Sequence, residues 1–168
     1  SFIAMSQKAW EATEKSNLPK FYLNLKSYKK SLLSNSNPYT PAVNLVFALD
    51  ESLKMMREEG LENIFHRHNK HKLALSNAVK ALNLKLFADE KYLSPSITAI
   101  QIEEMDAEVF RKTIKNKFDI LLAGGQDHLK GKIFRVGHLG YVNDRDIITV
   151  ISAISKTLLN LGKITAEQ

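Results

Sequence analysis

Arg135 is the residue whose type and setting most clearly suggest chemistry. It lies in the run 131–140, GKIFRVGHLG, where Ile133, Phe134 and Val136 favour a β-strand and the flanking glycines let the backbone turn. A guanidinium at the end of a strand can grip a carboxylate through two parallel hydrogen bonds, which a lysine cannot form. The pattern allows two interpretations: a carboxylate clamp, or an arginine that lies exposed on an edge strand.

Four histidines raise the question of further chemistry. His138 could orient the loop after Arg135, or make a structural hydrogen bond. His66, His68 and His71 point to about 0°, 200° and 140° around a helix, so they cannot converge on one metal ion from it. We predict no metal site, and we expect these three histidines to form a solvated, weakly basic helix face.

Two further stretches could bind an anion. Tyr39 and Thr40 precede a predicted helix, whose free N–H groups and dipole favour negative charge. Thr40 could equally be a plain N-cap, with Pro41 at the first helical position. The run 125–132, GQDHLKGK, is unlike a true phosphate loop, because five residues separate its glycines and Ile133 stands where a serine or threonine should be. We interpret it as a turn.

The spacing of apolar residues and capping signals predicts the elements that position these side chains. Residues 1–5 read as a buried strand, and 34–39 as a linker. Helices are expected over 7–15, 25–33, 41–59, 61–82, from 106 to about 114, and after Asn143 or Asp144, with strands over 84–87, 96–102, 120–122 and around Arg135. This order predicts a small α/β (α+β) domain over residues 42–168, with a mainly antiparallel sheet and helices on one face.

Composition limits the class of protein. The chain has 168 residues, of which 44% are hydrophobic and 25% charged, and it lacks cysteine, which excludes disulfides and favours a cytoplasmic location. It contains no run apolar enough to span a membrane and no signal peptide. The net charge of +6 is dispersed among acidic residues, as in the run 54–59, so we expect no nucleic-acid partner.

The longer motifs resemble a known family. The run GKIFRVGHLG, preceded by ILLAGG at 120–125, is similar to the C-terminal part of class V aminotransferases. The likeness is to the alanine–glyoxylate and serine–glyoxylate aminotransferases and to the small subunit of soluble hydrogenase. Further matches stand at 39–45, 58–62 and 66–68, so the resemblance covers nearly the whole chain in the right order.

The resemblance implies a fold and an activity. The fold would be the C-terminal domain of fold-type I transferases that depend on pyridoxal phosphate. The family moves an amino group from a small amino acid, such as alanine or serine, to a 2-oxo acid such as glyoxylate. Arg135 would bind the α-carboxylate of the amino acid. Thr40, and secondarily Tyr39, would reach the phosphate of the cofactor held by the other subunit of a homodimer.

The resemblance also implies that the imine-forming lysine lies outside this chain. Ser6-Gln7-Lys8 is similar to the Ser-x-Lys run around that lysine, but Lys8 falls on a helix after the strand that the family places downstream of it. Residues 1–41 would then be the end of the large cofactor-binding domain and a linker, and the fragment alone should be inactive. The alternative function is a non-catalytic α/β interaction module. The residues of this chain do not support a hydrogenase function, since it has no cysteine to ligate nickel, iron or a cluster.

Overall fold

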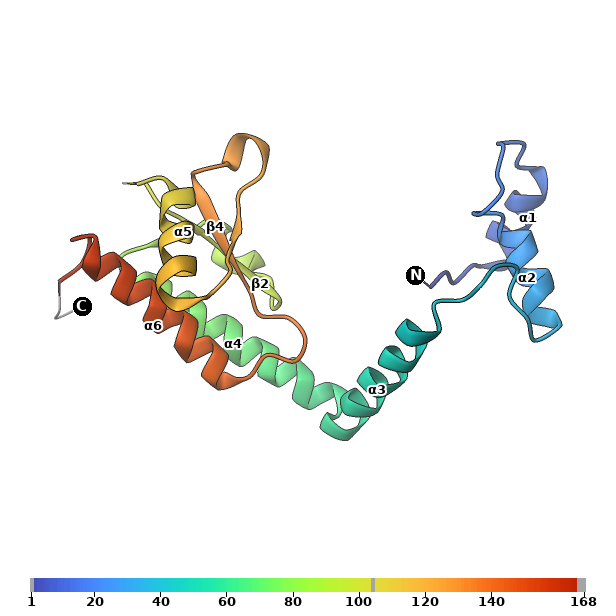
Figure 1. Ribbon diagram of the computed structural model, residues 1–168, viewed down its shortest axis with the longest axis horizontal. Coiled ribbons are helices and arrows are strands. Elements are labelled where there is room, and N and C mark those ends of the chain that lie inside the picture. Colours follow the sequence, from blue (N-terminus) through green and yellow to red (C-terminus); the bar gives the residue numbers. More distant parts are fainter. Residues whose placement is uncertain (1, 104, 166–168) are drawn as a thin grey trace. The chain divides into compact units, whose positions relative to one another are not determined.

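The computed structural model describes residues 2–103 and 105–165. The chain forms two compact units, one up to Lys54 and one from Met55 onward. Figure 1 shows both, coloured along the sequence. The division predicted at residues 41 and 42 concerns the domains of a longer protein and stays a prediction.

The first unit contains helices α1 (Gln7–Lys15) and α2 (Leu25–Leu33) and most of α3 (Val43–Glu59). The Ser6 hydroxyl accepts a hydrogen bond from the Ala9 N–H at 3.2 Å, and the Asn24 side chain accepts one from the Lys26 N–H at 3.2 Å. These caps satisfy N–H groups that the first helical turn leaves unpaired. Both helices therefore begin and end where the sequence predicts.

An aromatic cluster joins the linker to the start of this unit. The Tyr39 ring lies 4.7 Å from that of Tyr22, 5.8 Å from Phe21 and 6.0 Å from Tyr28, between ring centroids. The Tyr39 hydroxyl donates to the Phe21 carbonyl at 3.1 Å. The pKa of Tyr28 is raised because its neighbours desolvate its hydroxyl and because Tyr22 lies close. The cluster holds segment 38–39 against α2.

One prediction for this part of the chain is wrong. Residues 2–5 form no strand, and the side chain of Phe2 is 84% exposed; Ser1 lies outside the described residues. Helix α3 has an apolar stripe, yet none of its residues is buried in the described chain. An apolar pattern predicts which residues can be buried, but burial also needs a partner surface.

The second unit is built on a four-stranded antiparallel sheet in the order β1-β2-β4-β3. Helix α4 leads into the sheet, α5 connects β2 to β3, and α6 closes the chain. The bounds are α4 Leu61–Ala81, β1 Lys85–Leu86, the 3₁₀ turn η1 Glu90–Tyr92, β2 Ile97–Gln101, α5 Ala107–Phe118, β3 Ala123–Gly124, the 3₁₀ turn η2 Asp127–Leu129, β4 Ile133–Gly137 and α6 Asp144–Asn160.

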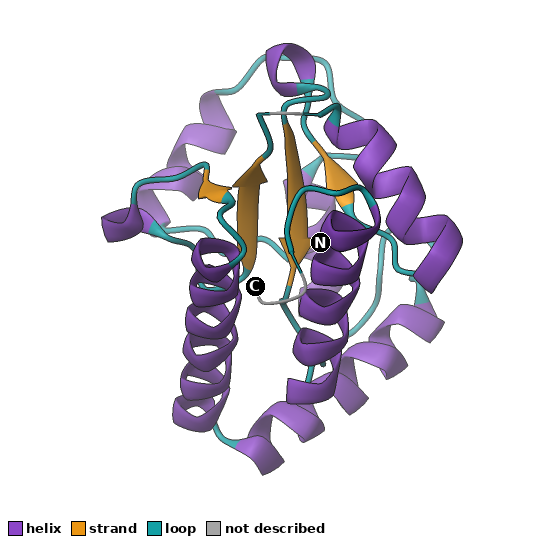
Figure 2. Cartoon of the chain, turned by 90° about the vertical axis from the view of Figure 1, so that its left-hand side faces the viewer, coloured by secondary structure: helices purple, strands orange, loops and turns teal. Residues whose placement is uncertain are grey.

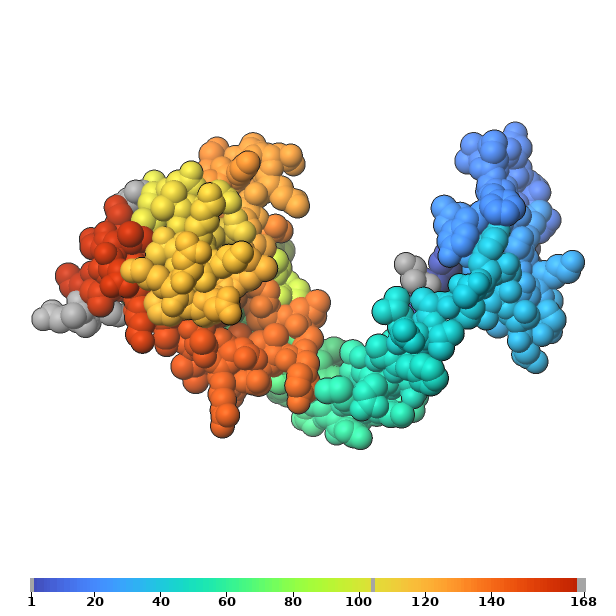
Figure 3. Space-filling view, in the orientation of Figure 1, coloured from blue at the N-terminus to red at the C-terminus, as the bar shows by residue number. Residues whose placement is uncertain are grey.

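One face of the sheet forms the core. Ile100 pairs with Phe134 and Thr98 with Val136 across β2 and β4, and all four are buried. The Phe134 ring stacks at 5.0 Å from that of Phe110, on α5. Figure 1 shows α4, α5 and α6 gathered beside the sheet, and Figure 2, viewed from that side, shows helices in front of the strands. The outward surfaces of α5 and α6 are visible in Figure 3. The predicted fold class is confirmed.

Helix α4 turns a partly polar face to this core. Its buried residues include His68, His71, Leu75 and Val79, spaced three or four apart as one face of a helix requires. Leu73, an apolar residue of the same helix, is exposed. Apolar residues alone therefore do not mark the inner face, because two histidines occupy inward positions.

The strand predicted over 120–122 is displaced to β3, Ala123–Gly124. Before β3, the Leu122 carbonyl accepts a hydrogen bond from Arg111 Nε on α5 at 2.7 Å, so a side chain supplies the partner that a strand would give. None of the helices in the described part of the chain combines the length and apolar character that crossing a membrane requires.

Candidate functional site

Arg135 lies in the middle of β4 on the sheet face that the helices leave uncovered. Side chains alternate along a strand, so Phe134 and Val136 point to the core and Arg135 points the other way. Its partners across the two neighbouring strands are Ala99 and Ala123. Small side chains on both sides leave the half-buried guanidinium accessible from this face.

The guanidinium of Arg135 is oriented by one hydrogen bond. Its Nε donates to the Gly124 carbonyl at 2.9 Å. Within the described residues, its Nη1 and Nη2 atoms have neither a hydrogen bond nor an ion pair. These two nitrogens form one end of the planar fork, and that end can hold both oxygens of a carboxylate at once. The geometry therefore favours the clamp over an arginine that merely lies on an edge.

Gly124, which accepts this hydrogen bond, is held in place from α5. A Cβ atom on Gly124 would lie 2.4 Å from Glu108 Oε1 and 2.8 Å from Arg111 Nη1, so a larger residue would displace these two side chains. Glu108 and Arg111 form an ion pair at 2.6 Å, and Arg111 also binds the Leu122 carbonyl. The ion pair thus fixes the short strand that orients Arg135.

His138 is fully buried just beyond β4. Its Nε2 pairs with the Thr98 hydroxyl at 2.9 Å, and its backbone N–H donates to the Ser96 carbonyl at 2.9 Å, which continues the β2–β4 ladder. The pKa of His138 is lowered because burial disfavours the charged ring and because His71 and His68 would repel the charge. Of the two predicted roles, the structural hydrogen bond is present.

His68 and His71 contradict the prediction of a solvated face. Both are buried, whereas His66 is exposed. His68 Nδ1 pairs with the Ile64 carbonyl at 2.8 Å, and its Nε2 accepts from the Gly140 N–H at 3.2 Å. His71 Nε2 pairs with Asp144 Oδ1 at 3.0 Å. These side chains connect α4 to the loop after β4.

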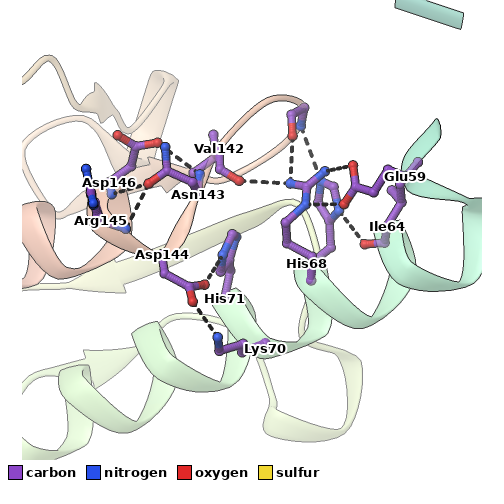
Figure 4. Close-up of polar contacts among 12 residues, drawn as sticks. Glu59, Ile64, His68, Lys70, His71, Val142, Asn143, Asp144, Arg145 and Asp146 are labelled. Atoms are coloured by element: carbon purple, nitrogen blue, oxygen red, sulfur yellow. Dashed lines mark hydrogen bonds and ion pairs between the residues drawn. The ribbon is translucent and has the colours of Figure 1, made fainter. Parts of the chain in front are cut away.

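Arg67 contacts both Glu59 and that loop through four hydrogen bonds, and Figure 4 labels the partners Glu59 and Val142. Its Nε and Nη2 donate to the two carboxylate oxygens of Glu59 at 2.5 and 2.8 Å, and its Nη1 donates to the Gly140 and Val142 carbonyls at 2.9 and 2.8 Å. The hydrogen bonds from Arg67 lower the pKa of Glu59. An arginine between two histidines is the one signal in the sequence that points to this residue, and nothing there predicts partners more than seventy residues away.

Asp144 completes this connection at the start of α6. Its carboxylate binds Lys70 Nζ at 2.5 Å as well as His71, and these two hydrogen bonds lower its pKa. Asn143 caps α6 in a capping box with Asp146. The loop from His138 to Asp144, which follows the Arg135 strand, is therefore held at several points along α4.

Tyr39 and Thr40 belong to the first unit, whereas Arg135 belongs to the second. The prediction that Thr40 caps α3 is wrong. The helix begins at Val43, and its first full-turn hydrogen bond runs from the Val46 N–H to the Ala42 carbonyl at 3.1 Å. The Thr40 hydroxyl has no partner among the described residues.

Lys8 is exposed on α1, as predicted. Two cavities in the described chain, of about 310 and 570 Å³, also lie apart from the candidate site. Leu82, Gln101 and Leu158 help to line the first, and Arg67 and Asn143 the second. Arg135 lines neither of them.

Known proteins are similar to this chain in both sequence and fold, although no protein-family model matches it. It is 53% identical over 161 residues to the soluble hydrogenase 42 kDa subunit of Anabaena cylindrica, covering 96% of this chain and 42% of that protein. It is 34% identical over 167 residues to the serine–glyoxylate aminotransferase of Methylorubrum extorquens, covering 95% and 42%. The crystal structure of ureidoglycine–glyoxylate aminotransferase from Bacillus subtilis matches with a TM-score of 0.87 and 29% identity, over 95% of this chain and 43% of that one.

This chain is a homologue of the class V aminotransferases. It spans about two fifths of the length of the relatives it matches, in their C-terminal part. The resemblance predicted from the motifs around Arg135 is confirmed. The roles of Arg135, Thr40 and Tyr39 within an aminotransferase stay predictions.

Proposed function

We propose that this chain supplies the carboxylate-binding arginine of a pyridoxal-phosphate-dependent class V aminotransferase. The enzyme would transfer an amino group from a small amino acid, alanine or serine, to a 2-oxo acid such as glyoxylate. The observation that carries the proposal is Arg135, whose guanidinium is oriented through Nε while Nη1 and Nη2 stay available on the open sheet face.

Arg135 would act by positioning. The amino donor and the 2-oxo acceptor both carry a carboxylate next to the reacting carbon, so one clamp can serve both. Two parallel hydrogen bonds fix the plane of the carboxylate and thereby the direction of the bonds at the neighbouring carbon. Holding a substrate in a reactive orientation lowers the barrier by several kcal/mol in favourable cases, on the order of 7–11 kcal/mol at most.

When bound, pyridoxal phosphate takes up the electrons released at the substrate's α-carbon. Of the residues in this chain, Thr40 fits a phosphate contact, because its hydroxyl is exposed and unpartnered among the described residues. Tyr39 fits less well, since its hydroxyl proton is already donated to the Phe21 carbonyl. We assign Thr40 to the phosphate of a cofactor held by the other subunit, with Tyr39 mainly orienting the segment.

The remaining parts of the proposal follow from the same assignment. Residues 1–41 would end the large domain and link it to the small domain, residues 42–168. The full-length protein would be a cytoplasmic homodimer without a nucleic-acid partner. Its imine-forming lysine would lie outside this chain, so this chain alone would not transaminate.

The proposal is tested by replacing Arg135 in the full-length protein. Arg135→Ala should raise the KM for the amino donor by about tenfold or more, because the carboxylate loses both hydrogen bonds. Arg135→Lys should leave the KM almost as high as in Arg135→Ala, because an ammonium cannot form two parallel hydrogen bonds with a carboxylate. Arg145→Ala, an exposed arginine on α6, is the matched control.

Cofactor absorbance is measured alongside to show that each variant still binds pyridoxal phosphate. A KM unchanged in Arg135→Ala, with the cofactor retained, would remove the basis of the assignment.

A further inference from the structure

Gly137 is the one glycine for which the described structure gives no conformational or packing reason. The chain has seven glycines. Four adopt a positive φ, between 66° and 84°, that only glycine adopts without strain. Gly124 and Gly125 cannot take a Cβ atom without a clash. At Gly137 the φ lies outside that region, and a Cβ atom would meet nothing within 4 Å.

The position of Gly137 suggests a reason that lies outside this chain. It stands two residues after Arg135 in β4 and pairs with Ile97, so a side chain there would project from the same open face as the guanidinium. The neighbours of Arg135 across the sheet are both alanine. On this face, Arg135 is flanked by alanines on the two neighbouring strands and, along its own strand toward the loop, by no side chain at Gly137. The residue across from Gly137 is the exposed Ile97.

We propose that Gly137 is a clearance residue of the carboxylate site. Its missing side chain leaves the room that a small 2-amino or 2-oxo acid occupies when its carboxylate binds Arg135, and the size of the residue at this position limits the substrates that fit. The inference rests on the proposed function of Arg135. It adds a specificity-determining position that does not itself form a hydrogen bond to the substrate.

The structure predicts an unusual pairing of effects for substitutions here. Gly137→Ala and Gly137→Val should leave the stability of the fold unchanged or slightly raised, because a Cβ atom there meets nothing within 4 Å and valine favours a strand. Substrate binding should nevertheless weaken with the size of the added side chain. A residue needed only for the fold would show the opposite pattern, with lower stability and unaltered binding.

The test uses the full-length protein and measures KM for L-alanine and for glyoxylate, thermal stability and cofactor absorbance. Gly137→Val should raise both KM values by about tenfold and Gly137→Ala by less, a range typical of one or two methyl groups in a binding site. Gly162→Ala is the matched control: its φ of 66° predicts lower stability, with KM unchanged.

Three outcomes separate the claims. If Arg135→Ala raises KM but Gly137→Val does not, the clearance inference fails while the proposed function stands. If Gly137→Val instead lowers thermal stability or cofactor retention without changing KM, the space accommodates another part of the protein, and the inference is wrong. If Arg135→Ala leaves KM unchanged, the proposed function fails first.

Discussion

The two faces of the sheet in the second unit differ in burial: one packs against the helices, and the other is accessible around Arg135. Toward the helices, Ile100 and Phe134 are completely buried and Phe134 stacks on Phe110. On the other face, Arg135 is bordered by alanines and Gly137, and the space above it is open. One five-residue strand therefore contributes to both the core and the candidate site. From Phe134 to Gly137, the effect of a mutation in β4 should therefore depend on which face the residue occupies; Ile133, at the start of the strand, is buried although it lies on the same side as Arg135.

The largest expected effect is on the packed face. Phe134→Ala should lower the free energy of unfolding by about 3–5 kcal/mol, because it removes a large side chain and leaves a cavity that the three helices cannot fill. Arg135→Ala, one residue away, should change it by less than about 1 kcal/mol. Urea unfolding of this chain measures both. Equal losses at the two positions would contradict the division of the strand into two faces.

A smaller effect on stability is expected in the loop that follows β4. Arg67→Ala should lower the free energy of unfolding by about 1–3 kcal/mol, because the partly buried Val142 carbonyl and the Glu59 carboxylate lose their donors. Arg67→Lys should restore only part of this stability, since it keeps the charge but not the fork. Arg145→Ala, an exposed arginine nearby, should change stability little. Full stability in Arg67→Lys would show that charge alone holds the loop.

The smallest expected effect is a dependence on acid. Hydrogen bonds from Arg67 lower the pKa of Glu59, so the folded state binds fewer protons than the unfolded state. This stability is complete above the ordinary pKa of 4.5 and is lost as the pH falls from there through the lowered value. Glu59→Gln should therefore reduce the loss of stability below that pH without abolishing it, because Asp144 contributes in the same sense.

Urea unfolding midpoints measured between about pH 7 and pH 3 would show this difference, as a shallower decline of stability with falling pH in Glu59→Gln. Glu62→Gln, on the exposed first turn of α4, is the control. If stability declines with falling pH as steeply in Glu59→Gln as in the unmodified chain, the Arg67–Glu59 pair is not maintained in solution.

Local features were predictable from the sequence and long-range ones were not. The helices that Ser6, Asn24, Asp106 and Asn143 cap begin within one residue of their predicted starts, because a cap depends on residues within one turn. The buried histidines of α4 were missed because their partners, Asp144 and Gly140, are more than seventy residues away.

The candidate site also combines local features that could be predicted and long-range features that could not. The type of residue and the strand around Arg135 could be predicted, since both follow from a short run of sequence. Its free guanidinium edge could not, because that depends on Gly124, eleven positions away, binding Nε and leaving the other nitrogens available. The absence of a structural reason for Gly137 is visible only when its surroundings are known.

The most direct test of the central claim is a crystal structure of the full-length protein with a bound 2-amino or 2-oxo acid. We predict that both oxygens of the carboxylate lie about 2.7–2.9 Å from Nη1 and Nη2 of Arg135, with Nε still bound to the Gly124 carbonyl. A carboxylate held by other groups, with Arg135 outside contact distance, would contradict the account.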